Sequence, residues 1–280
     1  MTVTSAEVRQ QRLRGFALYR RLQSLALWLE LIRNLAVRDV ETRYKHSLLG
    51  LYWAIVNPLV TAAIFSFVFG IIFGAASSTA YHMPYVVFVV SGLTFWNLFA
   101  NGIMSATISV TGSASLLAKL YFPRIVLPTA SVLARLIDFA FSLLVLAGFV
   151  AVYHVPLRWT SIWIVPVIGL QLMFTFGIGY LTASLNVLYR DMTQLVALVI
   201  MVWMYLSPVM YATTSVQGAL REILLLNPIG AFLQAERDLL FTGALTALPS
   251  LWIAVAWTAF VFVAGLSLFK RIEPLFAEVM

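Results

Sequence analysis

Cysteine and charged residues are what this sequence has least of. It contains no cysteine, and only 10% of its 280 residues are charged. Without cysteine there is no disulfide, no thiolate metal site and no thiol nucleophile. A soluble domain has about 25% charged residues, and 280 residues enclose too little interior to hide the 62% that are hydrophobic. We therefore expect an all-α integral membrane protein, with lipid around much of the chain.

Catalytic and metal-binding motifs are also absent. The sequence has no G-x-x-x-x-G-K-[ST] phosphate loop, no G-x-S-x-G and no H-E-x-x-H. The histidines, His46, His82 and His154, are far apart, and none stands at metal-ligand spacing from another ligand. The chain is therefore not expected to be an enzyme, to hold a metal or cofactor, or to hydrolyse ATP by itself.

The first 46 residues form a basic segment that differs from the rest of the chain. Nine of the 18 Lys and Arg residues precede His46. The basic stretch is too long for a signal peptide, and no short apolar run with a cleavage site follows. A helix from about Leu25 to Tyr44 is predicted to be amphipathic and to lie on the membrane surface, with Arg33, Arg38, Asp39 and Arg43 largely on its polar face. The alternative is a solvated helix packed on a partner protein.

Residues 47–280 are predicted to form a domain of six transmembrane helices. No charged residue occurs between Lys45 and Lys119, a stretch long enough for two spans of ~20 residues. The six spans are expected at about 51–74, 84–110, 125–153, 162–187, 193–211 and 249–269.

The segment 215–243 is predicted to be a re-entrant helical pair between spans five and six. Asn227 followed by Pro228 is a helix-start signature, so two short helices should flank this point. Neither is long enough to cross the membrane. We expect this pair, with Asn227, Pro228, Glu236 and Arg237, to form an outer gate; the alternative is a static hairpin that packs the last spans.

Basic residues predict the orientation of the chain. Six spans place both termini on one side, together with Lys119, Arg124 and the turn at Arg190–Asp191. Only Arg158, Arg221 and Arg237 fall on the other side. Both termini should therefore be cytoplasmic. The net charge of +7 is explained by this bias, so no nucleic-acid partner is expected.

Four residues are candidates for a translocation path. Arg135 and Asp138 lie three apart inside a span, either to neutralise each other near the interface or to act in transport. Tyr52 and Trp53, at the start of the first span, are either interfacial belt residues or platforms for sugar rings.

Several short segments resemble, in order, the permease subunits of polysaccharide ABC exporters. The segments are Arg43–Trp53 with Asn57–Pro58, Phe122–Arg124 with Leu127–Pro128, Asn186–Asp191, Ser207–Tyr211, and Asn227–Pro228 with Arg237. They cover nearly the whole chain. The family is that of the Wzm-like O-antigen and TagG-like teichoic-acid exporters.

The resemblance implies a bacterial plasma-membrane permease that forms a homodimer. Each copy would bind a separate nucleotide-binding subunit that supplies ATP and Mg²⁺, and the pair would export a glycan, usually lipid-linked. In the family, a helix in the first cytoplasmic loop docks on the ATPase, which here implies Leu116, Lys119, Phe122, Pro123 and Arg124.

Three other readings stay open. A permease of the same fold could export a drug or a lipid. A secondary transporter should show paired broken helices in two repeated halves, and only one broken region is evident. A membrane-embedded enzyme is disfavoured by the lack of any catalytic constellation.

Overall fold

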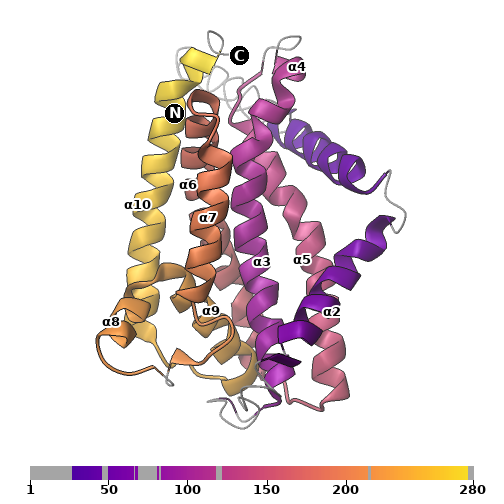
Figure 1. Cartoon of the computed structure of the whole chain (residues 1–280), viewed down its shortest axis with the longest axis vertical. Helices are drawn as coiled ribbons and strands as arrows, with labels where there is room; N and C mark the ends of the chain where they lie inside the picture. The colour runs from indigo at the N-terminus through magenta and orange to yellow at the C-terminus, as the bar shows by residue number, and fades with distance from the viewer. Residues whose placement is uncertain are drawn as a thin grey trace, which may run out of the picture.

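The computed structural model describes residues 27–45, 50–65, 67–68, 81, 83–117, 122–213 and 216–276. These residues are helical apart from turns and loops, and they form one bundle (Figure 1). Helix is expected here, because an apolar segment in lipid must satisfy its backbone N–H and C=O groups internally.

Four helices in the described ranges are long and apolar enough to cross a membrane. They are α3 (Tyr85–Ser109), α5 (Val126–Val152), α6 (Ile164–Leu188) preceded by the 3₁₀ turn η5 (Trp159–Trp163), and α10 (Leu248–Ile272). Their bounds lie close to the predicted spans two, three, four and six. A membrane protein of the all-α class is thus confirmed.

The other two predicted spans correspond to shorter apolar helices, so the count of six remains a prediction. The first is α2 (Trp53–Phe65), which follows the 3₁₀ turn η1 (Gly50–Tyr52). The second is α7 (Met192–Tyr205), whose 14 residues extend ~21 Å. It stops before the predicted end at Tyr211, because Pro208 has no N–H for the carbonyl of Met204 and restricts Ser207.

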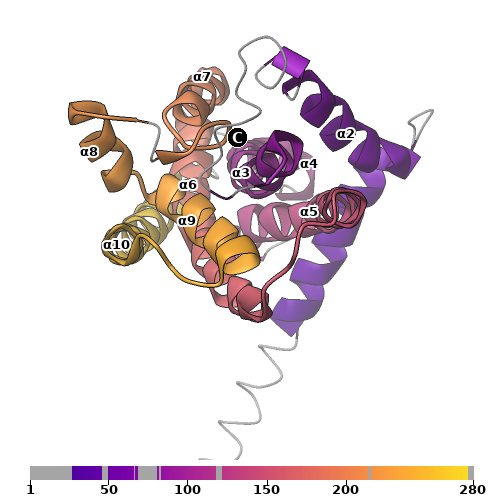
Figure 2. The same ribbon diagram turned by 90° about the horizontal axis from the view of Figure 1, so that it is seen from below.

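Helix α3 forms the centre of the bundle, with 20 of its 25 residues buried. The other helices surround it when the bundle is viewed from one end (Figure 2). Its aromatic side chains pack against α5, α6 and α7, as in the contact of Phe99 with Phe174 and Trp203. Any polar side chain on α3 is therefore positioned precisely relative to its neighbours.

Helices α6 and α10 touch through their backbones. A Cβ at Gly265 would overlap the carbonyl of Gly177, and a Cβ at Gly177 would lie 2.7 Å from the backbone nitrogen of Phe262. Facing glycines allow this approach because they have no side chain. The two helices run side by side for most of their length (Figure 1).

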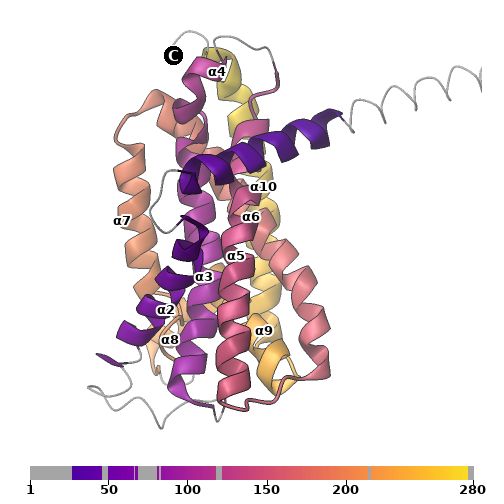
Figure 3. The same cartoon turned by 90° about the vertical axis from the view of Figure 1, so that its right-hand side faces the viewer.

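The N-terminal helix, residues 27–44, crosses the outside of the bundle near the end that carries α4 (Ala114–Leu117) and the 3₁₀ turn η4 (Thr111–Ser113) (Figure 3). The predicted helix is present, but Arg43 does not lie on its solvated face as predicted. Leu35 is buried and Ile32 packs beside it against other helices, whereas Leu29 is exposed. Arg43 points into the bundle rather than away from it, because Asp138 supplies a partner there.

Two short helices lie at the opposite end of the bundle from α4 (Figures 1 and 3). They are α8 (Ala219–Leu226) and α9 (Pro228–Arg237), which continues into the π-helical turn η7 (Asp238–Thr242). Pro228 occupies the first turn of α9, as predicted. The side chain of Asn227 does not cap that helix. Instead it accepts from Trp203 Nε1 at 3.0 Å and donates to Leu206 O at 2.9 Å, which fastens the break to α7.

Candidate functional site

A polar cavity of about 330 Å³ lies between the N-terminal helix, α2, α3 and α5. Its volume is within the range of small-molecule pockets. Uncharged polar groups line much of it: Tyr44, Trp53, Asn57, Thr94, Asn97, Asn101 and Ser142. Phe139 and Pro58 add apolar surface. A cavity of this composition inside an apolar bundle is a candidate binding site.

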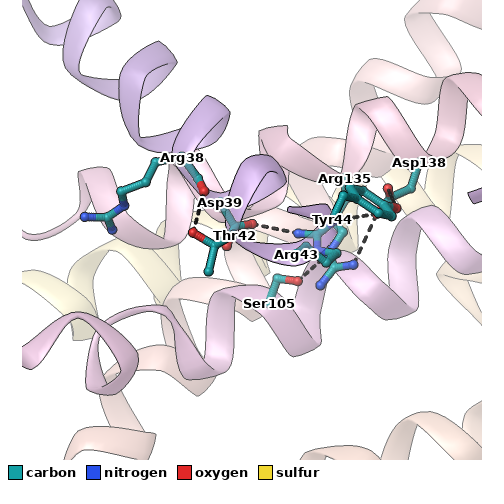
Figure 4. A network of polar contacts seen from close by, with 8 residues as sticks. All are labelled: Arg38, Asp39, Thr42, Arg43, Tyr44, Ser105, Arg135 and Asp138. Atoms are coloured by element: carbon teal, nitrogen blue, oxygen red, sulfur yellow. Dashed lines mark hydrogen bonds and ion pairs between the residues drawn. The ribbon is translucent and has the colours of Figure 1, made fainter. Parts of the chain in front are cut away.

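Three charged side chains, Arg43, Arg135 and Asp138, line this cavity, and Asp39 joins them through Arg43 (Figure 4). Arg43 Nη1 donates to Asp138 Oδ2 at 2.6 Å, and Arg43 Nη2 donates to Asp39 Oδ2 at 2.7 Å. Arg135 Nη1 donates to the same Asp138 oxygen at 3.1 Å, and Arg135 Nε donates to Ser105 Oγ at 2.5 Å. We call Asp39, Arg43, Arg135 and Asp138 the ionic cluster. Two arginines and two aspartates leave it without net charge.

Tyr44 is a further hydrogen-bond donor to Asp138. Its hydroxyl donates to Asp138 Oδ1 at 2.6 Å. Burial, and then this hydrogen bond, raise the pKa of Tyr44 to about 12. The phenol therefore stays protonated at neutral pH and remains a donor to the carboxylate.

A second cavity of about 420 Å³ lies on the α4 side of the ionic cluster. Arg43 and Arg135 line both cavities, so the cluster stands between them. The second cavity includes Ser105, Ser109 and Ser113 from the end of α3 and the turn after it. The two cavities together outline a polar region that runs along α3 toward the α4 end of the bundle.

Polar side chains recur along one stripe of α3. Thr94, Asn97, Asn101 and Ser105 are spaced by three or four residues, which places them on one face of a helix. The first three line the first cavity, and Ser105 lines the second. Asn57 joins them from α2. The three asparagines form no hydrogen bond with any described residue, although the other groups in the stripe do.

A different arrangement occurs at the α9 end, where Arg237 is only 2% exposed. Its guanidinium donates to Pro208 O at 2.5 Å, Val209 O at 2.6 Å, Phe88 O at 3.1 Å and Ser91 Oγ at 3.2 Å. It also lies 3.8 Å from the centre of the Phe88 ring. The first two carbonyls are available because α7 ends before them. Arg237 thus joins α9 to both α3 and α7.

The Arg237 guanidinium is tightly packed on its α3 side, and Arg237 borders a cavity of about 170 Å³ near Thr246. A Cβ on Gly92 would overlap its guanidinium and lie 2.5 Å from Val209 O. Burial lowers the pKa of Arg237 to about 10, so the side chain is still charged at pH 7. The three consecutive charged residues of this segment, Glu236, Arg237 and Asp238, are all buried. Protein acceptors and the Phe88 ring replace water around Arg237.

Glu236 and Asp238 are buried in contrasting ways. Asp238 accepts from Tyr81 at 2.8 Å and from the backbone N–H and hydroxyl of Thr246 at 2.7 and 2.6 Å. Neither carboxylate oxygen of Glu236 has a hydrogen-bond partner among the described residues. Burial raises the pKa of Glu236 well above the usual 4.5, which favours a protonated, neutral side chain.

The predicted coupling residues lie near the end of α10. Arg124 N donates to Glu273 Oε1 at 2.9 Å, and Arg124 Nη1 donates to Glu273 O at 2.8 Å. Leu116 and Phe122 pack beside Phe276 in one apolar cluster, Pro123 is exposed, and Lys119 lies outside the described residues. Arg124 is therefore engaged with η8 (Glu273–Leu275) rather than free.

The other predicted residues are distributed as follows. Trp53, Arg135 and Asp138 meet at the first cavity. Arg135 and Asp138 pair with each other there, as one of the two alternatives for these residues expects. Tyr52 is 71% exposed and does not line that cavity. Arg190 and Asp191 are exposed in the turn between α6 and α7. Asn227 and Pro228 lie at the junction of α8 and α9.

Sequence reasoning missed the asparagines and the partner of Arg43. The signal for Asn97 and Asn101 was available, since two amides at i and i+4 with Ser105 one turn later break an otherwise apolar span. The pairing of Arg43 with Asp138 had no such signal, because 95 residues separate them. Likewise, nothing in the sequence links Arg124 to Glu273.

Comparison with known proteins agrees with this architecture. Residues 30–241 match the model of the ABC-2 type transporter family. Two O-antigen export system permease proteins RfbA of Klebsiella pneumoniae are each 29% identical over 260 residues, covering 92% of this chain and 97% of theirs. A protein of that name from Myxococcus xanthus is 26% identical over 250 residues, or 89% of this chain and 94% of its own. The chain therefore belongs to the ABC-2 type transporter family and is a Wzm-like permease subunit.

Proposed function

We propose that this chain is the permease of an ATP-driven exporter that carries a lipid-linked polysaccharide across the bacterial inner membrane. The observation that carries the proposal is the polar cavity between α2, α3 and α5, lined by three asparagines and by Arg43, Arg135 and Asp138 of the ionic cluster. Relatives named as O-antigen export permeases support a glycan as the cargo. An uncharged drug or a simple lipid would not need such a lining.

An apolar groove beside the cavity supports a lipid anchor on the cargo. Ile55 and Leu59 of α2 line it together with Leu144 and Phe149 of α5. The same two helices thus present a polar surface on one side and an apolar surface on the other. A lipid-linked glycan has both kinds of surface, so its sugar and its lipid tail would each find a matching environment.

The distribution of charge supports cytoplasmic termini. In the described residues, the end of the bundle that carries α4 also carries Arg33, Arg38, Lys45, Arg124, Arg190, Lys270 and Arg271, whereas the α9 end carries Arg158, Arg221 and Arg237. Positive residues collect on the cytoplasmic side. The α9 end would then face outward, where α8 and α9 would close the path as an outer gate.

The remaining partners follow from the family. Two copies of the chain would enclose the path, and two separate nucleotide-binding subunits would supply ATP hydrolysis. The segment from Leu116 to Arg124 would contact these subunits. Its attachment to η8 suggests that the ATPase would act on α5 and α10 together, since Arg124 precedes α5 and Glu273 follows α10.

Deletion and complementation in the source bacterium test the proposal. Loss of the gene should abolish the surface polysaccharide and cause lipid-linked glycan to accumulate inside the cell, and the wild-type chain should restore both. Affinity purification of the chain should recover a nucleotide-binding subunit. Unchanged surface glycan in the deletion strain, together with altered efflux of a drug, would favour the drug exporter instead.

A further inference from the structure

The amide side chains of Asn57, Asn97 and Asn101 have no hydrogen-bond partner among the described residues, yet all three line one cavity. Asn57 and Asn101 are exposed in a single copy of the chain and Asn97 is half-buried, so water can reach these amides. A ligand that enters the cavity would have to replace that water with hydrogen bonds of its own. The free donors and acceptors of the amides are therefore available to such a ligand.

The chemistry of the cavity favours an uncharged ligand. Asp39 and Asp138 already neutralise Arg43 and Arg135, each through a contact of 3.1 Å or less. A phosphate would have to displace these carboxylates from the arginines. Each primary amide instead offers both N–H donors and a carbonyl acceptor, which matches a hydroxyl group that donates and accepts.

Two further features of the lining suit a sugar ring. Trp53 and Phe139 line the same cavity, and apolar aromatic surface can pack against the C–H faces of a pyranose. Pro58 lies within α2 and has no N–H to donate to the carbonyl of Ala54. Ala54 and Pro58 both line the cavity, so a backbone acceptor is available beside Asn57.

We propose that Asn57, Asn97 and Asn101 bind the hydroxyl groups of uncharged sugar residues in the exported glycan, and that Arg43, Arg135 and Asp138 of the ionic cluster form one wall of this subsite. The proposal rests on the proposed function and adds the recognition site. Asn57 and Asn101 are exposed in a single copy of the chain, so a glycan can reach them. The rival explanation is that these amides pair with a second copy of the chain.

Substitution by leucine separates binding from folding. Leucine removes the unpaired amide and is favourable in apolar surroundings, so Asn97→Leu/Asn101→Leu should insert and melt at the same or a higher temperature. Export of the surface glycan should nevertheless fall about ten-fold or more, because two hydrogen bonds to the cargo are lost. The control is Thr258→Val on α10, where the hydroxyl bonds only to Ala254 O of its own helix; export should remain normal.

Photo-crosslinking supplies a direct readout. p-Benzoylphenylalanine at Asn101, in cells that make the native glycan, should yield a permease band that carries glycan after irradiation. The same residue at Phe260, on the exposed face of α10, should not. Normal export by the double leucine variant, no glycan adduct at position 101, or dissociation of the purified homodimer in that variant would each overturn the subsite. In the same strain, loss of surface glycan on gene deletion tests the exporter function separately.

Discussion

The two ends of the bundle hold their arginines in different ways. Arg237 is surrounded by backbone carbonyls, a hydroxyl and an aromatic ring, with no carboxylate among its hydrogen-bond partners in the described residues and with its α3 side closely packed. Arg43 and Arg135 share Asp138 at the boundary of two cavities, and each side chain is about one-fifth exposed. A guanidinium held by fixed carbonyls has one arrangement. A carboxylate shared by two arginines can release one and keep the other, so the ionic cluster can rearrange at a smaller cost.

The strongest test of this comparison is the loss of Arg237. Arg237→Met should leave the carbonyls of Pro208 and Val209 without their donors in a buried site. We expect a loss of about 3 kcal/mol or more in the free energy of unfolding, seen as a lower melting temperature in detergent and a lower yield in membranes. Arg221→Met, on the exposed surface of α8, should change little. An unchanged melting temperature for Arg237→Met would remove the distinction between the two ends.

The buried carboxyl of Glu236 provides a second test at the α9 end, through the pH dependence of stability. Its pKa is raised in the folded state, so the folded chain binds this proton more tightly than the unfolded chain does. The contribution of Glu236 to the free energy of unfolding is fully present below about pH 4.5. It decreases as pH rises toward the pKa of the folded state, by as much as about 1.4 kcal/mol per pH unit. Glu236→Gln should remove this decrease, so its melting temperature relative to wild type should rise between pH 5 and 7.

Exposed Glu222 is the matched control for that measurement. Glu222→Gln should leave the pH dependence of melting as it is in the wild type. If Glu236→Gln and the wild type show the same dependence, the Glu236 carboxyl is not held protonated, and the α9 end contains an ionised carboxylate after all.

Substitutions in the ionic cluster should lower the free energy of unfolding less than Arg237→Met does. Asp138→Asn removes the charge shared by Arg43 and Arg135, and we expect a loss of about 1–2 kcal/mol because solvent screens part of it. The N-terminal helix should move away from α5, which electron–electron distance measurements between spin labels at Asn34 and Leu144 would detect. Asp39→Asn removes only the more exposed partner and should shift the distances less. Identical distances in Asp138→Asn and wild type would show that the cluster does not hold this helix.

Arg124 extends the comparison to a fourth arginine, with the smallest expected effect on stability. Arg124→Ala loses the side-chain bond to Glu273 O, whereas Glu273→Ala keeps that bond and loses only the acceptor of the Arg124 N–H. Each should cost about 1 kcal/mol. Arg124→Ala should also reduce export per ATP hydrolysed more than Glu273→Ala does, as measured in proteoliposomes with the ATPase subunit. Equal export per ATP in both variants would show that this contact does not transmit ATPase motion.

Composition and hydrophobic periodicity were enough to predict the elements of this fold. Long apolar runs ended by charges or prolines marked α3, α5, α6 and α10, and Asn227–Pro228 marked the start of α9. The end of α7 was placed too late, because residues 209–211 are apolar enough to continue a helix and this pattern outweighed the local signal of Pro208. The carbonyls of Pro208 and Val209 beyond this end are bound by Arg237 from a distant segment.

The site was only partly predictable, for a physical reason. Arg135 and Asp138 are three residues apart, so their pairing follows from helix geometry. Arg43 with Asp138, and Arg124 with Glu273, join segments separated by 95 and 149 residues. Local sequence contains no information on such pairs. The direction in which Arg43 points depends on whether a carboxylate lies on the side of the N-terminal helix that faces the bundle. Only the packing of the helices places Asp138 there.

The backbone contact between Gly177 and Gly265 has a mechanical consequence. At that point the two helices have no side chain between them, and one turn away Tyr180 of α6 packs on Phe262 and Phe269 of α10, so we expect α6 and α10 to move together. At one end of this helix pair, Glu273 accepts a hydrogen bond from Arg124. The other end adjoins the loop in which Thr246 donates to Asp238. A displacement of the helix pair at one membrane face would therefore reach the opposite face almost undiminished, because the pair keeps its shape.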